Sequence, residues 1–346
     1  MDNLLIKPDF KINLISVIII AFNRRIFLRQ CIDSVVHQTL QRNNFEVLVL
    51  KNFVDLNLER DYANNEVKFV NLGNEPVGEY IKKGLILAKG EIVSFLDDDD
   101  VFYPDKLDTV YKIFQQNDKL IYLHNNFSYE ENKHKTKFQP KKRFINDIVI
   151  RNNRGLERIN SHKLNIIWKN SLAINLSSVS IKRNSILENV LLFKNITGMT
   201  DYFILMCCLL KNDVELLFTT QILNIYKISE GETHSTDLFE IVKEKLIKLS
   251  KAQIQSAYPF VSLMVWTPYQ KLPLFILSQW RLIYWIGNVN ERTTKLFLKD
   301  LYFYLKYNLF RKPIFAIPLL IISCLSIVFP MFSLKIFLIL KKNMLY

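Results

Sequence analysis

Four consecutive aspartates, Asp97, Asp98, Asp99 and Asp100, are the residues of this sequence whose spacing most clearly suggests chemistry. Adjacent carboxylates repel one another, and a cation that neutralises them stabilises such a cluster. In an extended segment the side chains of Asp97 and Asp99 would point to one face, and those of Asp98 and Asp100 to the opposite face. One pair of carboxylates can therefore face a ligand. Carboxylate oxygens suit Mg²⁺ or Mn²⁺, which commonly keep positions open for phosphate oxygens. The alternative is a solvated acidic turn before Pro104.

The elements predicted around this cluster place it at the end of a buried strand. Asp97 directly follows the apolar segment 91–96, and three earlier apolar segments have the same character: 14–22, 45–50 and 67–71. Amphipathic periodicity predicts helices over 24–40, which Asn23 could cap, and over about 78–89. This alternation predicts a doubly wound α/β sheet, and ligands of such sheets bind beyond the carboxyl ends of the strands.

Other kinds of site find no support in the sequence. The eight glycines form neither a dinucleotide-binding nor a P-loop motif, and there is no nucleophile elbow. The four cysteines lack the spacing of a zinc site or a disulfide framework, and the five histidines are scattered. The first ten residues do not resemble a signal peptide, so we expect the chain in a reducing cytoplasm.

The positive charge is concentrated near the C-terminus. The formal net charge is +13, and residues 251–346 contain 12 basic and 2 acidic residues. The first 250 residues are therefore close to neutral, which argues against a nucleic-acid partner. The basic segment 130–170 has two interpretations, a solvated surface or a flap over an acceptor site that meets an anionic partner.

The C-terminal region from about residue 235 has the composition of membrane-associated helices. Residues 291–312 fit an amphipathic helix at a headgroup boundary. Residues 313–334 carry no charge and as a helix would be about 33 Å long, which matches a hydrocarbon core of about 30 Å. The alternative is a buried core helix, and three prolines in this segment weaken it as one straight span. We expect this region to associate with the cell membrane, either as a single membrane-spanning segment or as a segment that lies at the interface.

The chain from about residue 15 to 235 resembles the family 2 inverting glycosyltransferases, which have the GT-A fold. Three segments carry the resemblance: 15–40 (ISVIIIAFNRRIFLRQCIDSVVHQTL), 78–107 (GEYIKKGLILAKGEIVSFLDDDDVFYPDKL) and 198–203 (GMTDYF). The middle segment is the most specific, because Ala-Lys-Gly-Glu, an apolar strand, Asp-x-Asp and Pro-Asp-Lys-Leu follow in the family's order.

This resemblance implies an α/β fold of the GT-A (Rossmann-like) type, a mixed sheet flanked by helices. Its nucleotide-sugar-binding half would cover 13–110 and its acceptor-binding half 111–234, followed by an α-helical, membrane-associating region over 235–346. The donor would be a nucleotide-diphosphate sugar linked to UDP, GDP or dTDP. The catalytic domain would lie on the cytoplasmic side of the membrane, where nucleotide sugars are found.

The donor site implied by the resemblance includes residues of three segments. Ile20, Ala21, Phe22 and Asn23 would line the pocket of the base. Asn52 stands where the family usually has an aspartate that accepts a hydrogen bond from the base, and its amide oxygen can still accept one. The family's usual arginine is absent from the segment around Ile81, and Lys82 or Lys83 would take over its phosphate contact.

The resemblance also implies roles for the catalytic residues. Asp97 and Asp99 match the Asp-x-Asp motif, with Asp99 as the direct ligand of Mn²⁺ or Mg²⁺ and Asp98 or Asp97 as the sugar or ribose contact. Asp201 matches the acidic residue that serves as general base, although Thr200 replaces the preceding glutamate. A single base without a covalent intermediate implies one in-line displacement with inversion. The alternative for Asp201 is an acid that merely favours a helix N-terminus.

Two further family positions differ. Tyr226-Lys227-Ile228-Ser229 stands where the family has Tyr-Arg-x-His, and His234 is a weak substitute for the lost histidine.

The acceptor expected from the location of the domain is a membrane lipid or a lipid-linked glycan. We expect transfer to a hydroxyl of a membrane-linked saccharide or polysaccharide. The rival hypotheses are a polyprenyl-phosphate sugar synthase and a non-catalytic nucleotide-sugar-binding membrane protein. The donor sugar, the linkage and the oligomeric state stay open.

Overall fold

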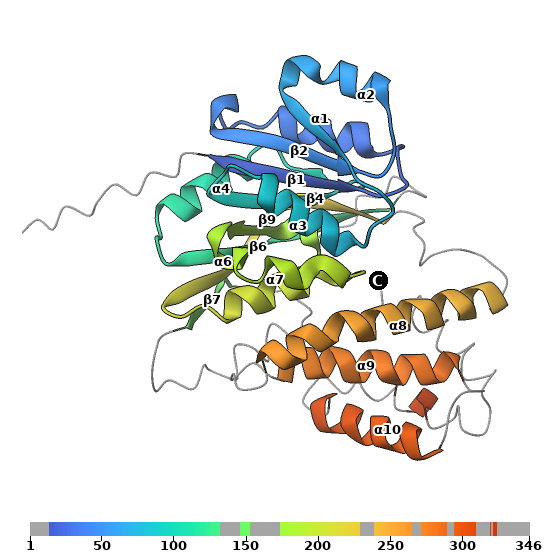
Figure 1. Cartoon of the computed structure of the whole chain (residues 1–346). Helices are drawn as coiled ribbons and strands as arrows, with labels where there is room; N and C mark the ends of the chain where they lie inside the picture. Colours follow the sequence, from blue (N-terminus) through green and yellow to red (C-terminus); the bar gives the residue numbers. More distant parts are fainter. Residues whose placement is uncertain are drawn as a thin grey trace, which may run out of the picture.

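The computed structural model describes residues 14–131, 146–152, 174–228, 239–264, 271–288, 294–308, 319 and 321–323. In the first part of the chain strands and helices alternate as predicted (Figure 1). The elements are β1 (Ile15–Ala21), α1 (Leu28–Val36), β2 (Phe45–Lys51), α2 (Leu56–Asp61), β3 (Val67–Asn71), α3 (Val77–Leu87) and β4 (Ile92–Asp97). Short 3-10 turns, η1 (Arg42–Asn44) and η2 (Ala63–Asn65), precede β2 and β3.

Helix α1 is shorter than the sequence predicts, and Asn23 does not cap it. The N-cap position is Phe27, which makes no side-chain cap hydrogen bond. Asn23 has a left-handed backbone with φ 59°, and its N–H bonds the side chain of Asn52 instead. A contact between two strand ends has therefore replaced the helix cap that the local sequence suggests.

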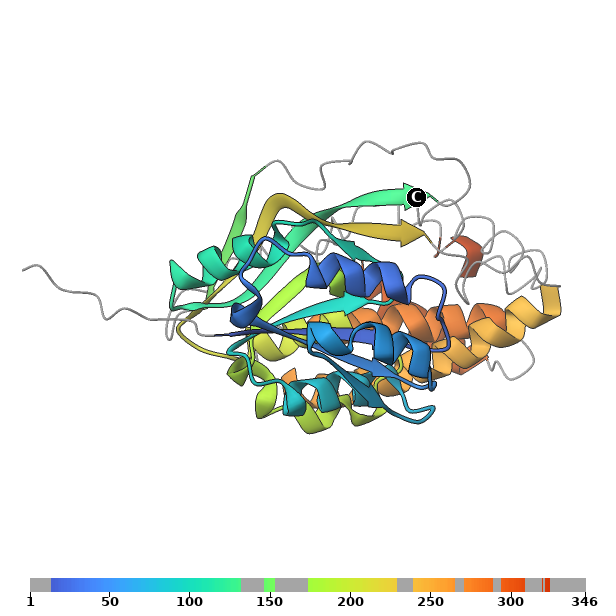
Figure 2. The ribbon, with the colours of Figure 1, turned by 90° about the horizontal axis from the view of Figure 1, so that it is seen from above.

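The strands form one mixed sheet in the order β3-β2-β1-β4-β8-β6-β9-β5, with β7 paired to β9. The first four are parallel, and β4 pairs antiparallel with β8 (Val179–Lys182). Strands β6 (Leu120–Glu131) and β9 (Val214–Ile228) run side by side in the same direction (Figure 2). The short strands β5 (Val101–Phe102) and β7 (Ile148–Asn152) pair antiparallel with β9. This confirms the expected mixed α/β sheet.

Helices cover both faces of the sheet, which explains why β1 is apolar throughout. Val17 and Ile19 face a cluster that includes residues of α1 and α4 (Lys106–Gln115), whereas Ile18 and Ile20 face one formed with α3 and α7 (Thr200–Leu209). Side chains alternate between the faces of a strand, so a strand covered on both sides is buried along its whole length. Burying one such side chain contributes about 1.5–3 kcal/mol.

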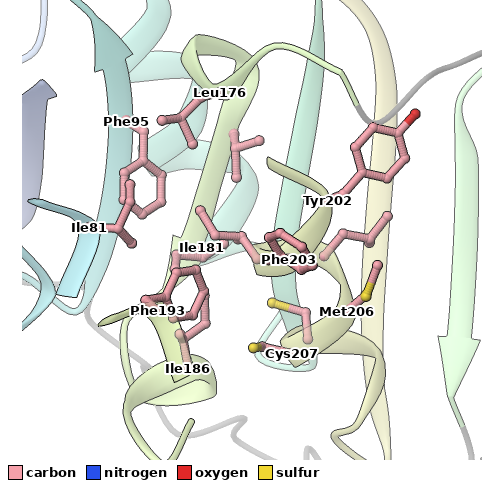
Figure 3. Packing of buried hydrophobic residues seen from close by; sticks show 14 of the residues in the cluster. Ile81, Phe95, Leu176, Ile181, Ile186, Phe193, Tyr202, Phe203, Met206 and Cys207 are labelled. Carbon is pink, nitrogen blue, oxygen red and sulfur yellow. The ribbon is translucent and has the colours of Figure 1, made fainter. Parts of the chain in front are cut away.

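The second face continues into the C-terminal helices. The chain reaches α7 through η3 (Leu176–Ser178), α6 (Asn184–Leu187) and η4 (Val190–Asn195). Phe260 of α8 (Phe239–Met264) stacks on Phe203 of α7 with ring centroids 4.3 Å apart. The cluster around Phe203, drawn in Figure 3, also includes Ile276 and Leu277 of α9 (Lys271–Gly287). Helix α7 therefore lies between the sheet and α8 (Figure 1).

A further apolar cluster joins α9 to α10 (Thr294–Asn308) through residues such as Ile286 and Phe297. The predicted helical character of the C-terminal region is confirmed for these helices. Among the described helices none combines the length and the apolar composition needed to cross a bilayer. The uncharged segment 313–334 lies almost wholly outside the described residues, as does most of the basic segment 130–170.

Candidate active site

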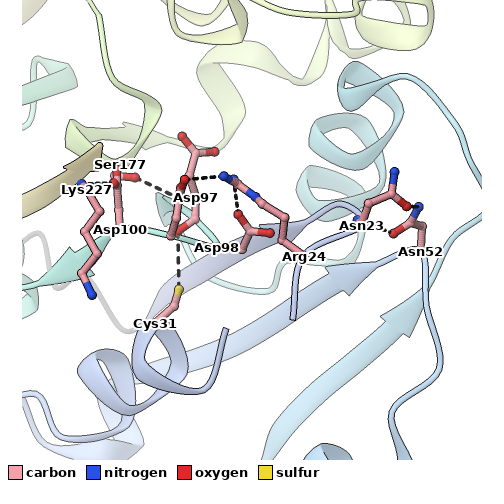
Figure 4. A network of polar contacts seen from close by, with 10 residues as sticks. Asn23, Arg24, Cys31, Asn52, Asp97, Asp98, Asp100, Ser177 and Lys227 are labelled. Carbon is pink, nitrogen blue, oxygen red and sulfur yellow. Dashed lines mark hydrogen bonds and ion pairs between the residues drawn. The ribbon is translucent and has the colours of Figure 1, made fainter. Parts of the chain in front are cut away.

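The carboxyl ends of β1, β2 and β4 lie next to one another in the sheet. Ala21, the last residue of β1, pairs in register with Lys51 of β2, and Ile20 pairs with Asp97 of β4. Polar residues that follow these strands are therefore brought together, as Figure 4 shows.

The aspartate cluster forms a buried turn. The Asp100 N–H donates to the Asp97 carbonyl oxygen over 3.1 Å, so the four residues are not the extended segment that the sequence suggests. The two pairs of aspartates expected from the sequence still differ in how far they are exposed. Asp98 and Asp100 are 2% and 1% exposed, whereas Asp97 and Asp99 are half-buried. The alternative of a solvated acidic turn is thus correct about the turn and wrong about the solvation.

Arg24 is the first functional candidate that the sequence analysis missed. It forms ion pairs with both Asp98 and Asp99 (Figure 4). Its guanidinium supplies positive charge where two acidic side chains would otherwise repel each other. The available signal was its position just beyond β1, the neighbour of β4 in the predicted sheet.

Burial and mutual repulsion favour the protonated forms of these acids. Burial raises the pKa of Asp98 to about 7, an effect that Arg24 opposes and Asp99 reinforces. Burial, together with the charge of Asp99, raises the pKa of Asp100 to about 8. The pKa of Asp97 lies well above its usual range, mainly through burial and then through its three acidic neighbours. One further cation at this position would offset the repulsion.

The donor atoms of this cluster fit a divalent metal ion. The Oδ2 atoms of Asp98 and Asp100 are buried without a hydrogen-bond partner in the described part of the chain. Hard carboxylate oxygens are the ligands that Mg²⁺ and Mn²⁺ prefer. Within the described ranges no three His, Cys, Asp or Glu side chains form a ready ligand set. A metal here would therefore need ligands from a substrate or water as well.

A layer of polar residues holds the aspartate turn from behind. The Asp97 N–H donates to Ser177 Oγ over 3.0 Å, and the Ser177 side chain also bonds Asp100. The Lys227 N–H donates to Asp100 Oδ1 over 3.0 Å. Lys106 donates to the Ser177 carbonyl and to Asn125 Oδ1, each over 2.7 Å, and burial pushes its pKa well below the usual range.

Lys227, which stands where the family has arginine, reaches the cluster through its backbone N–H, while its Nζ donates to Gln30 Oε1. Its neighbour Ser229 and the weak substitute His234 lie outside the described residues.

Asp201 is in the first turn of α7, as the helix-terminal interpretation expects. Its Oδ1 accepts the Tyr202 N–H over 2.8 Å, and its Oδ2 accepts the Asn175 N–H over 2.9 Å. The side chain is 9% exposed, and this burial raises its pKa to about 6, although the backbone N–H donors act in the opposite direction. A carboxylate with this pKa is ionised at neutral pH and is basic enough to take a proton.

A short segment connects Asp201 to the aspartate cluster. Asn175 contacts Asp201, Ser177 contacts Asp97 and Asp100, and Asn175 Oδ1 accepts the Ser177 N–H over 2.9 Å. Two residues span at most about 7 Å of backbone, so the segment from Asn175 to Ser177 brings Asp201 and the aspartate turn near each other. Asn175 and Ser177 were not predicted from the sequence, because their segment contains no motif.

Three asparagines lie on the other side of Arg24. The Asn23 N–H donates to Asn52 Oδ1 over 2.9 Å, and Asn52 Nδ2 donates to Asn23 Oδ1 and Asn74 Oδ1 over 2.8 and 2.7 Å. The structure thus brings the predicted Asn23 and Asn52 together. Phe22 beside them is exposed and meets the ring of Tyr80 edge-on.

Three predicted residues of the donor site direct their side chains to other contacts. The side chains of Ile20 and Ala21 are buried in the two apolar clusters, so they do not line a pocket. Inside a strand covered on both faces, only their backbone is left for a ligand. Lys82 pairs with Glu79 of its own helix at 2.6 Å, and no recorded contact in the described residues joins it to the aspartates. Its phosphate contact stays a prediction.

Comparisons with known proteins agree with this geometry. Residues 16–191 match the family model described as glycosyl transferase family 2. An uncharacterized glycosyltransferase of Nostoc sp. is 32% identical over 117 residues, which cover 32% of this chain and 36% of the relative. Glycosyltransferase GlyG of Streptococcus pneumoniae is 26% identical over 127 residues, which cover 34% of this chain and 40% of the relative. These matches therefore span less than half of the curated relatives.

Likeness in structure extends over more of the chain. The crystal structure of S. aureus TarS residues 1–349 has a TM-score of 0.57 at 14% identity and covers 93% of this chain and 89% of that one. The same protein in complex with UDP gives the same TM-score at 15% identity. At this identity the likeness establishes the fold, a GT-A-like mixed sheet flanked by helices.

Proposed function

Because the model of glycosyl transferase family 2 matches residues 16–191, the chain belongs to this family, and we propose that it transfers a sugar from a nucleotide-diphosphate sugar to a hydroxyl group. One observation carries the proposal. The buried aspartate turn and Asp201 are joined by the segment from Asn175 to Ser177, beyond the carboxyl ends of β1 and β4. Sheets of this kind bind their ligands there.

The proposed donor is a UDP-, GDP- or dTDP-linked sugar. TarS, which shares the fold, has been solved with UDP and with UDP-GlcNAc. The amides of Asn23, Asn52 and Asn74 offer donors and acceptors that can meet a base edge, and the exposed ring of Phe22 offers a stacking surface. These features support a nucleotide at the ends of β1 and β2.

Asp99, together with Asp97, would hold Mn²⁺ or Mg²⁺. When bound, the ion acts as a Lewis acid toward the departing diphosphate. Arg24 already contacts Asp98 and Asp99, and its half-exposed side chain can bind diphosphate oxygens. Asp98 would be left to orient the sugar or the ribose.

Asp201 would accept the proton of the attacking hydroxyl. The two backbone N–H donors fix its carboxylate in direction, and each oxygen keeps a lone pair for the acceptor. With one base and no covalent intermediate, the transfer is a single displacement that inverts the anomeric centre.

The proposed acceptor is a saccharide or polysaccharide carried by the membrane. Helix α10 supports this part of the proposal, because Lys295, Lys299 and Lys306 are all on its exposed side, together with the exposed Leu298 and Tyr302. A basic surface with apolar side chains is suited to an anionic bilayer. The catalytic domain would then work at the cytoplasmic face of the cell membrane.

Calorimetric titration of the purified chain with UDP, GDP and dTDP in the presence of Mn²⁺ tests the donor. We expect one nucleotide to bind in the micromolar range, and Asn52→Ala to weaken this binding by about tenfold through the loss of a hydrogen bond to the base. Absence of binding by all three nucleotides contradicts the proposal.

A further inference from the structure

The segment that leads into α7 is enclosed by three helices. On one side the Gly78 N–H at the start of α3 donates to the Ile196 carbonyl oxygen over 2.8 Å. On the other side the Thr197 N–H donates to Ser256 Oγ of α8 over 3.2 Å. Trp280 of α9 donates its indole N–H to the sulfur of Met199 over 3.1 Å. Residues 197–199 are therefore held by helices that lie outside the sheet.

This segment lies close against α8. A Cβ atom added to Gly198 would lie 2.2 Å from Nε2 of Gln253, a buried residue of α8. Met199, which comes next, has a left-handed backbone with φ 56°. Such a conformation is unfavourable for a residue with a side chain and persists only where the surroundings enforce it. The contacts from α8 and α9 supply that enforcement two residues before Asp201.

We propose that Ser256 and Trp280 are positioning residues for sugar transfer: they fix the turn at residues 197–199 and thereby the direction of the Asp201 carboxylate. The proposal rests on the proposed role of Asp201 as general base. A misplacement of about 1 Å at a reacting group can cost up to about a hundredfold in rate, so a turn held from outside the sheet matters for catalysis. The C-terminal helices are then part of the catalytic machinery.

Helix α8 contains a matched control for Ser256. Ser256 and Ser250 are both buried, and each donates over 2.8 Å to the carbonyl four residues earlier, that of Ala252 and that of Leu246. The contact with Thr197 distinguishes Ser256. Replacing either serine by alanine removes one hydroxyl and one intrahelical bond, but only Ser256→Ala releases the turn.

The experiment compares both variants in the full chain. Three quantities are measured: steady-state transfer with the donor that the nucleotide titration indicates, the Kd of the nucleotide, and amide hydrogen exchange over residues 196–203. We expect Ser256→Ala to speed exchange in this segment and to lower kcat by about five- to twentyfold, with the nucleotide Kd unchanged. Ser250→Ala should leave all three near wild type, and Ser256→Thr, which keeps the hydroxyl, should recover most of kcat.

Equal kcat values for Ser256→Ala and Ser250→Ala overturn the proposal, as does faster exchange in Ser256→Ala without loss of kcat. A chain that turns over no sugar nucleotide refutes the proposed function instead. In that case the exchange measurement still decides whether α8 holds the turn, and equal exchange in the two alanine variants overturns that part too.

Discussion

Crowding of carboxylates at the end of β4 determines the acidity and the hydrogen bonding of individual residues in this site. Asp97, Asp98 and Asp100 have raised pKa values because burial, complete for Asp98 and Asp100 and partial for Asp97, adds to their mutual repulsion, part of which Arg24 offsets. The orphaned carboxylate oxygens of Asp98 and Asp100 are acceptors without a described donor. A buried acceptor of this kind is costly unless a ligand binds to it.

Loss of the Asp99 carboxylate should weaken metal binding directly. We expect Asp99→Ala to raise the Kd for Mn²⁺ by at least about tenfold, because a metal site with few protein ligands depends on each charged oxygen. Calorimetry with Mn²⁺ alone measures this. Asp108→Ala is the control, since Asp108 pairs with Lys112 on α4 away from the cluster. The same Kd in both variants speaks against Asp99 as a ligand.

The pKa of Asp201 sets the acid limb of the pH profile. A general base works when deprotonated, so protonation of Asp201 should lower kcat/KM tenfold per pH unit below about 6. Asp201→Asn should lower kcat by about 10²–10⁴-fold and abolish this limb. Steady-state rates from pH 5 to 8 provide the check. A small loss in Asp201→Asn would favour a lipid-phosphate acceptor, which needs little help from a base.

The sequence identified the acidic residues of the site but not those that organise them. Asp97, Asp99 and Asp201 stand in motifs, and burial around the motifs agrees with their predicted importance. Arg24 contacts residues about 75 positions away, and Asn175 lies in a segment without a motif. Contacts of this kind arise from tertiary structure, which no local pattern encodes. For Ile20 and Ala21 the two-sided sheet buries the side chains, so only their backbone is left to line a pocket.

At the scale of elements, close approach of α3 to η4 positions the segment that precedes α7. A Cβ atom on Gly78 would lie 1.9 Å from the Phe193 carbonyl oxygen, which is backbone and cannot rotate away. The helix therefore requires glycine where it meets η4. The bond from the Gly78 N–H to Ile196 depends on the same approach.

Gly78→Ala should consequently lower the free energy of unfolding by about 1–3 kcal/mol through overpacking. Gly73→Ala is the matched control, because an added Cβ there meets nothing within 4 Å. Urea unfolding followed by circular dichroism measures both variants. Equal midpoints would show that α3 and η4 can separate without cost.

Buried parallel strands were predicted accurately because their apolar segments are short and rich in β-branched residues. Helix ends were predicted less well: Asn23 bonds a neighbouring strand end instead of capping α1. Strand β9 pairs with β6 on both sides of residues 220 and 221, and the register shifts at these polar residues.

For the whole molecule, the C-terminal helices link the catalytic sheet to a basic surface. Phe260 of α8 packs in the same cluster as the sheet, and α9 connects it to α10. The sequence predicted the helical character of this region but not its attachment to α7. The membrane segment at 313–334 stays a prediction.

The basic side of α10 should determine binding to lipid. We expect the triple variant Lys295→Gln, Lys299→Gln, Lys306→Gln to bind vesicles containing phosphatidylglycerol about a hundredfold more weakly, at about 1 kcal/mol per lysine. Co-sedimentation measures the bound fraction. The control replaces three exposed lysines of the sheet domain, Lys68, Lys112 and Lys119. Equal losses in the two triple variants would contradict a specific role for α10.

The central claim is that the aspartate turn and Asp201 act together to break a sugar nucleotide and transfer its sugar. Release of free nucleoside diphosphate from UDP-, GDP- and dTDP-sugars by the purified chain with Mn²⁺ tests this most directly. The account predicts that wild type releases one of these diphosphates and that Asp99→Ala and Asp201→Asn each lose nearly all of this activity. Release at wild-type rates by both variants, or no release by the wild-type chain with any donor, would contradict it.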